Sequence, residues 1–189
     1  MCFHRTARLI HNVPILVDTM TEYCPQFFTA SIVNWYQLLK PDKYKEVIID
    51  SMRFLVNNKR VNIYAFAIMP NHVHIIWSAA NDHQYKNIQR DFLKFTAQRI
   101  KFDLVENHPM VLEKFESNRK DRAYQFWQNR ALSIPLYTEK VFQQKLNYLH
   151  NNPIQPHWNL CEKAEDYKYS TAGFYENGVE HWDFITNYF

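Results

Sequence analysis

The sequence predicts an α+β domain in which helices pack on one antiparallel sheet. Segments rich in β-branched and aromatic residues alternate with segments whose apolar residues recur at helical spacing. Their order along the chain is strand, helix, strand, strand, helix, strand, helix. Two neighbouring strands are joined by so short a connection that we expect them to pair as an antiparallel hairpin.

The first predicted strand is the aromatic and β-branched segment 27–36. Lys40-Pro41-Asp42 interrupts this pattern and marks the start of a helix that runs to about Asn57. Asp42 is a suitable N-cap for that helix, because its side chain can accept a hydrogen bond from an unpaired backbone N–H of the first turn.

Residues 61–68 and 72–78 are the second and third predicted strands, with Met69-Pro70-Asn71 as the tight turn between them. Side chains alternate between the two faces of a strand. His72 and His74 are therefore expected to project from the same face of the sheet.

A long helix is expected next, capped by Asn81 or Asp82 and ending near Val105. Residues 106–122 have the composition of a connecting segment. One or two further strands are expected in 124–127 and 131–136, which are again rich in aromatic and apolar residues.

The last predicted helix is capped by Thr138, runs to about Asn151 and is stopped by Pro153. At about 100° per residue, one stripe of this helix should face the core. That stripe contains Phe142, Leu146 and Leu149, and a second stripe contains Val141, Lys145, Tyr148 and Asn152. The complete order of elements is that of a ferredoxin-like sheet with helices packed on it.

The composition allows one domain with a real core and excludes several functions. The chain has 189 residues, 47% of them hydrophobic, and only two glycines, so it has no glycine-rich phosphate or dinucleotide loop. The net charge of +3 permits a polyanionic partner without requiring one. Three distant cysteines and no long apolar run predict a cytoplasmic protein without a membrane segment or a signal peptide.

The histidine pair is the strongest chemical signal. Imidazole is a common metal ligand at neutral pH, so His72 and His74 could bind one ion together. The simpler alternative is that both only pack or hydrogen-bond within the sheet. Two other histidine chemistries are excluded, because the chain has no H-E-x-x-H motif and because Ile76 stands where a histidine-triad hydrolase would have its third histidine.

Tyr148 and Asn152 lie one turn apart on a helix face that is not the core face. Lys145 lies one turn before Tyr148 and could stabilise a phenolate, although an ordinary solvated lysine would satisfy the same pattern. Because the chain has twelve tyrosines, a structural role is the plain alternative for Tyr148. For Asn152 the alternative is a helix C-cap.

These strings resemble the IS200-like single-tyrosine transposases of the HUH nuclease superfamily and, more closely, the REP-associated tyrosine transposases. The resemblance covers about residues 26–175 and is carried by Met69-Pro70-Asn71-His72-Val73-His74, Phe126-Trp127-Gln128 and Tyr148-Leu149-His150-Asn151-Asn152-Pro153. A weaker match follows in 165–172. There the family usually has Pro-Trp-Ser-Ser, and Lys168, Tyr169 and Thr171 depart from it.

The resemblance implies an HUH endonuclease fold and a role for each matching residue. It implies that His72, His74 and Asn152 bind Mg²⁺ or Mn²⁺ and that Tyr148 is the nucleophile, which forms a 5′-phosphotyrosine with single-stranded DNA beside a hairpin. We then expect an N-terminal extension (1–24), a catalytic domain (25–155) and a C-terminal extension (156–189) that packs on the domain or contacts DNA. The protein would act as a monomer or a homodimer.

DNA binding requires cations near the phosphates, and aromatic rings beside them suit unpaired bases. The candidates are Lys94, Arg119, Lys120, Arg122, Trp127, Arg130 and Lys145. A solvated charged face above buried rings would give the same pattern.

Two other functions remain open from the sequence. One is a non-catalytic module of the same fold that binds nucleic-acid hairpins. The presence of His72, His74, Tyr148 and Asn152 argues against it. The other is a two-histidine phosphoesterase for small nucleotides, whose activity would survive the substitution Tyr148→Phe.

Overall fold

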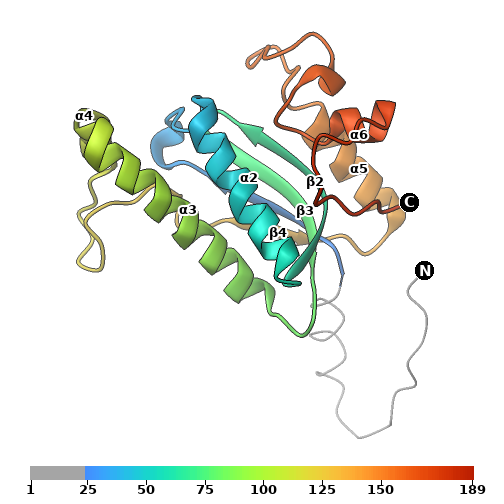
Figure 1. The fold of residues 1–189 in the computed structure, drawn as a ribbon, viewed down its shortest axis with the longest axis horizontal. Coiled ribbons are helices and arrows are strands. Elements are labelled where there is room, and N and C mark those ends of the chain that lie inside the picture. The colour runs from blue at the N-terminus through green and yellow to red at the C-terminus, as the bar shows by residue number, and fades with distance from the viewer. Residues whose placement is uncertain (1–23) are drawn as a thin grey trace, which may run out of the picture.

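The computed structural model describes residues 24–189 (Figure 1). Its main elements are β1 (Gln26–Ser31), α2 (Asp42–Asn57), β2 (Val61–Met69), β3 (His72–Ala79), α3 (Tyr85–Asn107), β4 (Leu132–Pro135) and α5 (Glu139–His150). The predicted order of strands and helices is therefore confirmed. The predicted N-terminal extension lies outside the described residues except for Cys24.

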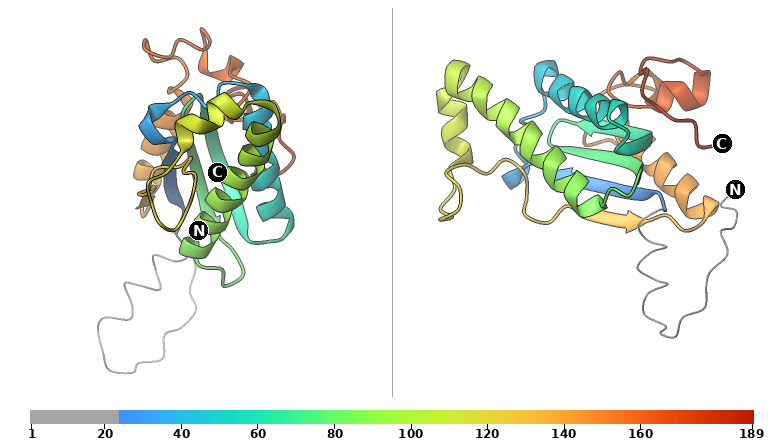
Figure 2. Two further views of the ribbon diagram at one scale, coloured as in Figure 1. Left: turned by 90° about the vertical axis from the view of Figure 1, so that its left-hand side faces the viewer. Right: turned by 60° about the horizontal axis from the view of Figure 1, so that its bottom comes forward.

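The four strands form one sheet in the order β2-β3-β1-β4, and every neighbouring pair is antiparallel. This arrangement is the α+β, ferredoxin-like sheet that the sequence predicts. Helices α2 and α3 cross one side of the sheet, and α5 lies on the other (Figures 1 and 2). The strand that carries the two histidines, β3, has a neighbour on each side, so its backbone is fixed along its whole length.

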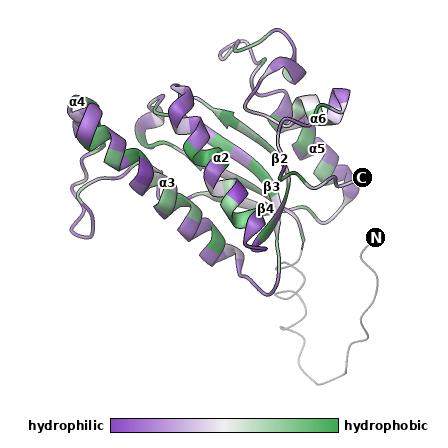
Figure 3. Cartoon of the chain, viewed as in Figure 1, coloured by the Kyte–Doolittle hydropathy of each residue, from purple (hydrophilic) through white to green (hydrophobic). Residues whose placement is uncertain are grey.

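The larger part of the core lies between the sheet and helices α2 and α3. Val73, Ile75 and Trp77 of β3 are fully buried on this side, and the Trp77 ring stacks on Phe28 with centroids 5.0 Å apart. Figure 3 shows the strands coloured mainly as hydrophobic, whereas α3 alternates between hydrophilic and hydrophobic residues. The alternation along β3 consequently turns His72 and His74 to the opposite side, toward α5.

Helix α5 packs on that opposite side through the predicted stripe of Phe142, Leu146 and Leu149, all of which are buried. On β2, the short side chains of Ala65 and Ala67 pack in the same cluster as this stripe. Thr138 is the N-cap, as predicted, and its hydroxyl accepts a hydrogen bond of 3.3 Å from the Val141 N–H. The helix ends at His150 with Asn151 as C-cap, so Asn152 follows directly after its last turn.

The first half differs from the predictions in two places. The first strand ends at Ser31 rather than at residue 36, because a 3-10 turn, η1 (Val33–Trp35), redirects the chain. The N-cap of α2 is Pro41, and the Asp42 carboxylate instead accepts a hydrogen bond from Lys45 Nζ.

Helix α3 begins later than predicted, and Asn81 and Asp82 do not cap it. Both residues have positive φ angles and form a turn after β3, and the N-cap is Gln84. Residues 106–122 are not wholly irregular, because they contain the short helices α4 (Pro109–Leu112) and η2 (Glu113–Phe115).

The later segments also differ from the predictions. Residues 124–127 make only isolated bridges, so the second of the two possible strands, β4, is the one that forms. The chain after residue 156 contains η3 (Ala164–Asp166) and α6 (Ala172–Asn177) and contacts β2 through bridges from Ser170 and Ile185. Between residues 24 and 189, no helix combines the length and the apolar character needed to cross a bilayer.

Candidate active site

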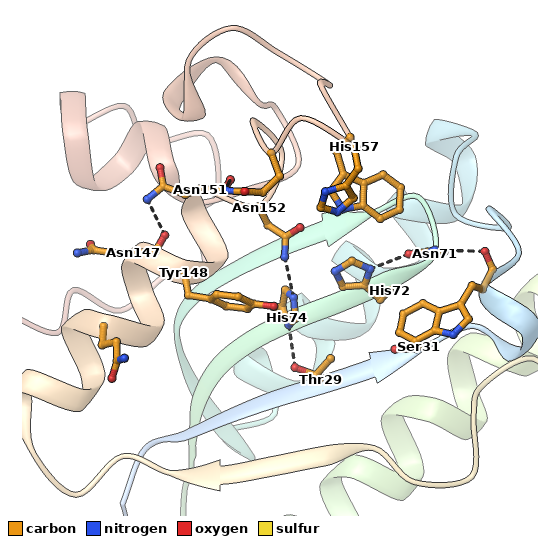
Figure 4. Close-up of a pocket in the computed structure, with 14 residues that line it drawn as sticks. Thr29, Ser31, Asn71, His72, His74, Asn147, Tyr148, Asn151, Asn152 and His157 are labelled. Atoms are coloured by element: carbon orange, nitrogen blue, oxygen red, sulfur yellow. Dashed lines mark hydrogen bonds between the residues drawn. The ribbon is translucent and has the colours of Figure 1, made fainter.

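A cavity of about 790 Å³ opens on the α5 side of the sheet (Figure 4). Its walls come from β1, the η1 turn, β3, α5 and the segment that follows α5. The four residues expected to do chemistry, His72, His74, Tyr148 and Asn152, all line it. Residues separated by almost 80 positions in the sequence therefore face one space.

The two histidines lie side by side on β3, with ring centroids 4.6 Å apart. The antiparallel pairing of β1 with β3 places Thr29 opposite His74 and Ser31 opposite His72. Both imidazoles are buried, with 7% of His72 and 3% of His74 exposed. Their position is thus set by the register of the sheet and not by a loop.

Hydrogen bonds fix the tautomer of each ring. His72 Nδ1 lies 2.7 Å from Asn71 Oδ1, an atom that can only accept, so this nitrogen carries the proton. The Asn152 amide Nδ2 lies 3.0 Å from His74 Nε2 and donates to it, so the proton of His74 is on Nδ1 and is donated to Thr29 Oγ1 at 2.7 Å. Nε2 is therefore the unprotonated nitrogen of each ring, which is the form that binds a metal; in His74 it accepts the hydrogen bond from Asn152.

Burial favours the neutral form of both imidazoles. Desolvation, helped by the charge of His157, lowers the pKa of His72 to about 4, and desolvation together with His72 and Lys145 lowers the pKa of His74 well below its usual value. Neutral imidazoles can act as metal ligands without first losing a proton, although an ion at His74 would have to replace the hydrogen bond from Asn152.

The position of Asn152 also fits a divalent cation. If an ion replaced the hydrogen bond to His74, the Asn152 amide would turn over so that its oxygen faced the ion. That oxygen would then lie about 3 Å from His74 Nε2, which is the separation of adjacent ligands with metal bonds of about 2.1 Å. No cluster of three His, Cys, Asp or Glu side chains occurs in residues 24–189, and the cavity walls contain no carboxylate. A cation held by these uncharged groups would retain its full charge for an anionic ligand.

Tyr148 projects from α5 toward His74 (Figure 4), with ring centroids 5.3 Å apart and the rings nearly perpendicular. Its side chain is 53% exposed, although it also contacts the ring of Phe27. A tyrosine that only served the core would be buried. The phenol is instead accessible from the cavity.

Lys145 brings a positive charge to the same place. Its Nζ lies 5.6 Å from the ring centroid of Tyr148 and 5.1 Å from that of Phe27. An ammonium group this close to the ring adds positive potential beside Tyr148.

The other predicted DNA-binding residues lie elsewhere. Lys94, Arg119 and Arg122 line a second cavity, of about 690 Å³, between α3 and the chain after η2. Both arginines form salt bridges with Asp121, whose negative charge partly neutralises theirs. Lys120 and Arg130 are exposed and do not line either cavity.

Trp127 also lines the second cavity, but little of it is exposed there. Its ring belongs to the hydrophobic core with 6% of the residue exposed, and its Nε1 donates to Thr96 Oγ1 at 3.1 Å. Most of the ring is therefore used in packing, and its predicted contact with DNA stays a prediction.

Sequence analysis missed several residues of the site. Thr29 belongs to it only through the pairing of β1 with β3. His157 and Trp158 reach the cavity from the chain beyond α5, and the Trp158 ring lies 5.8 Å from that of His72. The sequence did draw attention to Asn71, because this residue immediately precedes His72 in the segment that resembles the transposases. The segment alone does not show that the Asn71 side chain contacts His72.

Comparison with known proteins identifies similar solved structures. No protein-family model matches this sequence, and no curated protein matches it. The solved structure of a REP-associated tyrosine transposase bound to a REP hairpin is similar over 99% of this chain and 93% of its own, with a TM-score of 0.60 and 18% identity. A candidate transposase from Deinococcus radiodurans R1 is similar over 79% of this chain and 97% of its own, with a TM-score of 0.47 and 13% identity.

The first of these similarities, at 18% identity, shows a shared fold. The α+β fold expected from the resemblance is thereby confirmed, and the two chains are of nearly equal extent.

Proposed function

We propose that this protein is a single-tyrosine transposase of the HUH type, similar to the REP-associated branch. It acts as a metal-dependent endonuclease and strand transferase on single-stranded DNA beside hairpins. In this proposal residues 25–155 form the catalytic domain and 156–189 a C-terminal extension. The observation that carries it is the meeting of His72, His74, Asn152 and Tyr148 in one cavity.

The reaction follows from what Tyr148 can do. Its phenolic oxygen loses a proton and attacks the phosphorus of a DNA phosphodiester, which forms a phosphotyrosine bond to the 5′ end. The bond from phosphorus to the 3′ oxygen breaks, and that oxygen takes up a proton and leaves as a 3′-hydroxyl. A 3′-hydroxyl of another strand can attack the same phosphorus and release Tyr148, so strand joining needs no nucleotide cofactor.

His72, His74 and Asn152 would hold Mg²⁺ or Mn²⁺. A divalent ion bound there supplies Lewis-acid chemistry by withdrawing charge from a phosphate oxygen. The residues of the chain complete the site: Asn71 and Thr29 orient the two imidazoles, and Lys145 adds positive charge next to the phenol. The uncharged ligand set leaves the phosphate to neutralise the ion.

In this proposal the phosphate backbone of the hairpin follows the second cavity. Lys94, Arg119 and Arg122 line it, and Lys120 and Arg130 belong to the same stretch of chain. Cations spaced along a groove bind nucleic acid with little dependence on sequence. This cavity would hold the DNA while the first cavity performs the reaction, in a monomer or in a homodimer.

Formation of a covalent adduct tests the proposal. The protein is mixed with 5′- or 3′-labelled single-stranded oligonucleotides that carry a hairpin, in the presence of Mn²⁺, and analysed on denaturing gels. We expect an adduct that resists SDS, that retains only the label on the 3′ side of the cut, and that is absent with Tyr148→Phe or EDTA. Tyr137→Phe is the matched control, because this tyrosine is 60% exposed and precedes α5.

Three outcomes separate the candidate functions. An adduct lost in Tyr148→Phe and kept in Tyr137→Phe supports the transposase mechanism. Binding of hairpin DNA by the wild-type protein without any adduct contradicts it and favours a non-catalytic binding module. Hydrolysis of small nucleotides that survives Tyr148→Phe contradicts both and favours a two-histidine phosphoesterase.

A further inference from the structure

Trp35 is an aromatic residue of the active-site cavity that the proposed chemistry does not use. Its side chain is 59% exposed and lines the cavity together with the two histidines. The next residue, Tyr36, packs edge-on against Phe115 with centroids 5.6 Å apart. Tyr36 is 40% exposed but rests against Phe115, whereas more of Trp35 is exposed although its indole would gain from burial.

The backbone at this position is strained. Asn34 and Trp35 have φ angles of 54° and 55°, in the left-handed region. Asparagine tolerates this region, whereas a bulky residue such as tryptophan rarely adopts it. Strain of this kind persists only where surrounding contacts enforce it, and it is concentrated at functional sites.

The contacts that enforce this conformation come from the turn before the histidines. The Ile32 N–H donates to the Asn71 carbonyl and the Leu39 N–H donates to the Pro70 carbonyl, each at 2.8 Å. The Asn71 amide Nδ2 donates to the Trp35 carbonyl at 3.2 Å, and its Oδ1 accepts from His72 Nδ1 at 2.7 Å. One asparagine side chain therefore holds both the strained loop and a candidate metal ligand.

We propose that Trp35 is a stacking platform for one unpaired nucleobase, that of a nucleotide next to the scissile phosphate. This inference rests on the proposed DNA function and adds a base-binding subsite to it. A phosphate at His72 and His74 brings the neighbouring nucleotide to the wall that carries the indole. Stacking on an indole face accepts any base, so Trp35 positions the strand rather than reading its sequence.

The substitution Trp35→Asn tests this role without imposing new strain, because asparagine tolerates the left-handed region. Binding is measured by fluorescence anisotropy in the Tyr148→Phe background, with hairpin oligonucleotides that carry a single-stranded flank. We expect Trp35→Asn to weaken binding about 5- to 100-fold, as loss of one base–aromatic stack does. Its melting temperature should be unchanged or higher.

Phe54→Ala is the matched control. Phe54 is 57% exposed, like Trp35, but it lies on α2 on the opposite side of the sheet. Loss of affinity in Trp35→Asn and not in Phe54→Ala supports the platform. An equal loss in both, or in neither, overturns it.

An abasic scan of the oligonucleotide provides a second measurement on the chain that retains Trp35. We expect one unpaired position at which removal of the base weakens binding about 5- to 100-fold. The same removal should have no further effect in Trp35→Asn, because the two changes delete one interaction. Fully additive effects at every position overturn the inference.

These measurements separate the platform from the catalytic proposal. If the coupling between Trp35 and one base is found while wild-type protein forms no adduct, the platform stands and the catalytic mechanism fails. If the adduct forms and no coupling is found, the mechanism stands and the platform fails.

Discussion

Replacing Thr29 by valine would remove one hydroxyl and keep the branched shape of the side chain. Thr29 lies opposite His74 in the sheet, and its Oγ1 accepts the proton of His74 Nδ1 at 2.7 Å. Without this acceptor a buried N–H is left unpaired, which should lower the free energy of unfolding by about 1–3 kcal/mol. The ring also loses the partner that fixes its tautomer, and loss of such a partner weakens metal binding about 10- to 100-fold, or about 1.4–2.7 kcal/mol.

The assay is a Mn²⁺ titration of adduct formation with single-stranded DNA, together with urea unfolding in EDTA. Thr29→Val should raise the Mn²⁺ concentration at half-maximal adduct formation about 10- to 100-fold. Thr29→Ser keeps the hydroxyl, so its midpoint should remain close to that of the wild type. A Thr29→Val midpoint within twofold of wild type would refute the argument that Thr29 orients His74 for metal binding.

Two further predictions concern charge. Lys145→Met keeps the length of the side chain but removes the ammonium group, which lies 5.6 Å from the Tyr148 ring centroid. We expect the covalent adduct to form about tenfold more slowly in this variant. An unchanged rate would show that this charge does not act on the reaction. Burial lowers the pKa of His150, whose Nε2 lies 2.9 Å from Thr171 Oγ1, to about 4. The folded state therefore resists a proton that the unfolded state accepts at a pKa of about 6.5, so stability falls as the pH falls from about 6.5 to 4, by about 3 kcal/mol for this residue. Because His72 and His74 also have lowered pKa values, both proteins should lose stability between pH 7 and pH 4 in urea unfolding in EDTA. The loss should be about 3 kcal/mol larger in wild type than in His150→Gln, and equal losses in both proteins would contradict the prediction.

Local periodicity determined much of what the sequence reveals about this protein. The two-residue repeat of β3 placed His72 and His74 on one face, and the helical repeat of α5 separated its buried stripe from Tyr148. Both inferences need only neighbours within one element, where the geometry is the same in every protein. The order of elements followed from the same periods and from the positions of the turns.

Tertiary structure decided the features that depend on distant segments. Thr29 contacts His74 because of the register between their strands, and Asn152 contacts the same ring from 78 positions away in the sequence. The N-cap of α3 is Gln84, because Asn81 and Asp82 form a turn before the helix. Trp127 and Trp35 show the point most clearly. Both are tryptophans near other aromatic residues in the sequence, but long-range packing buries the first and leaves the second exposed at the active-site cavity. The sequence pattern alone cannot distinguish them, because burial depends on how distant segments fold over each side chain.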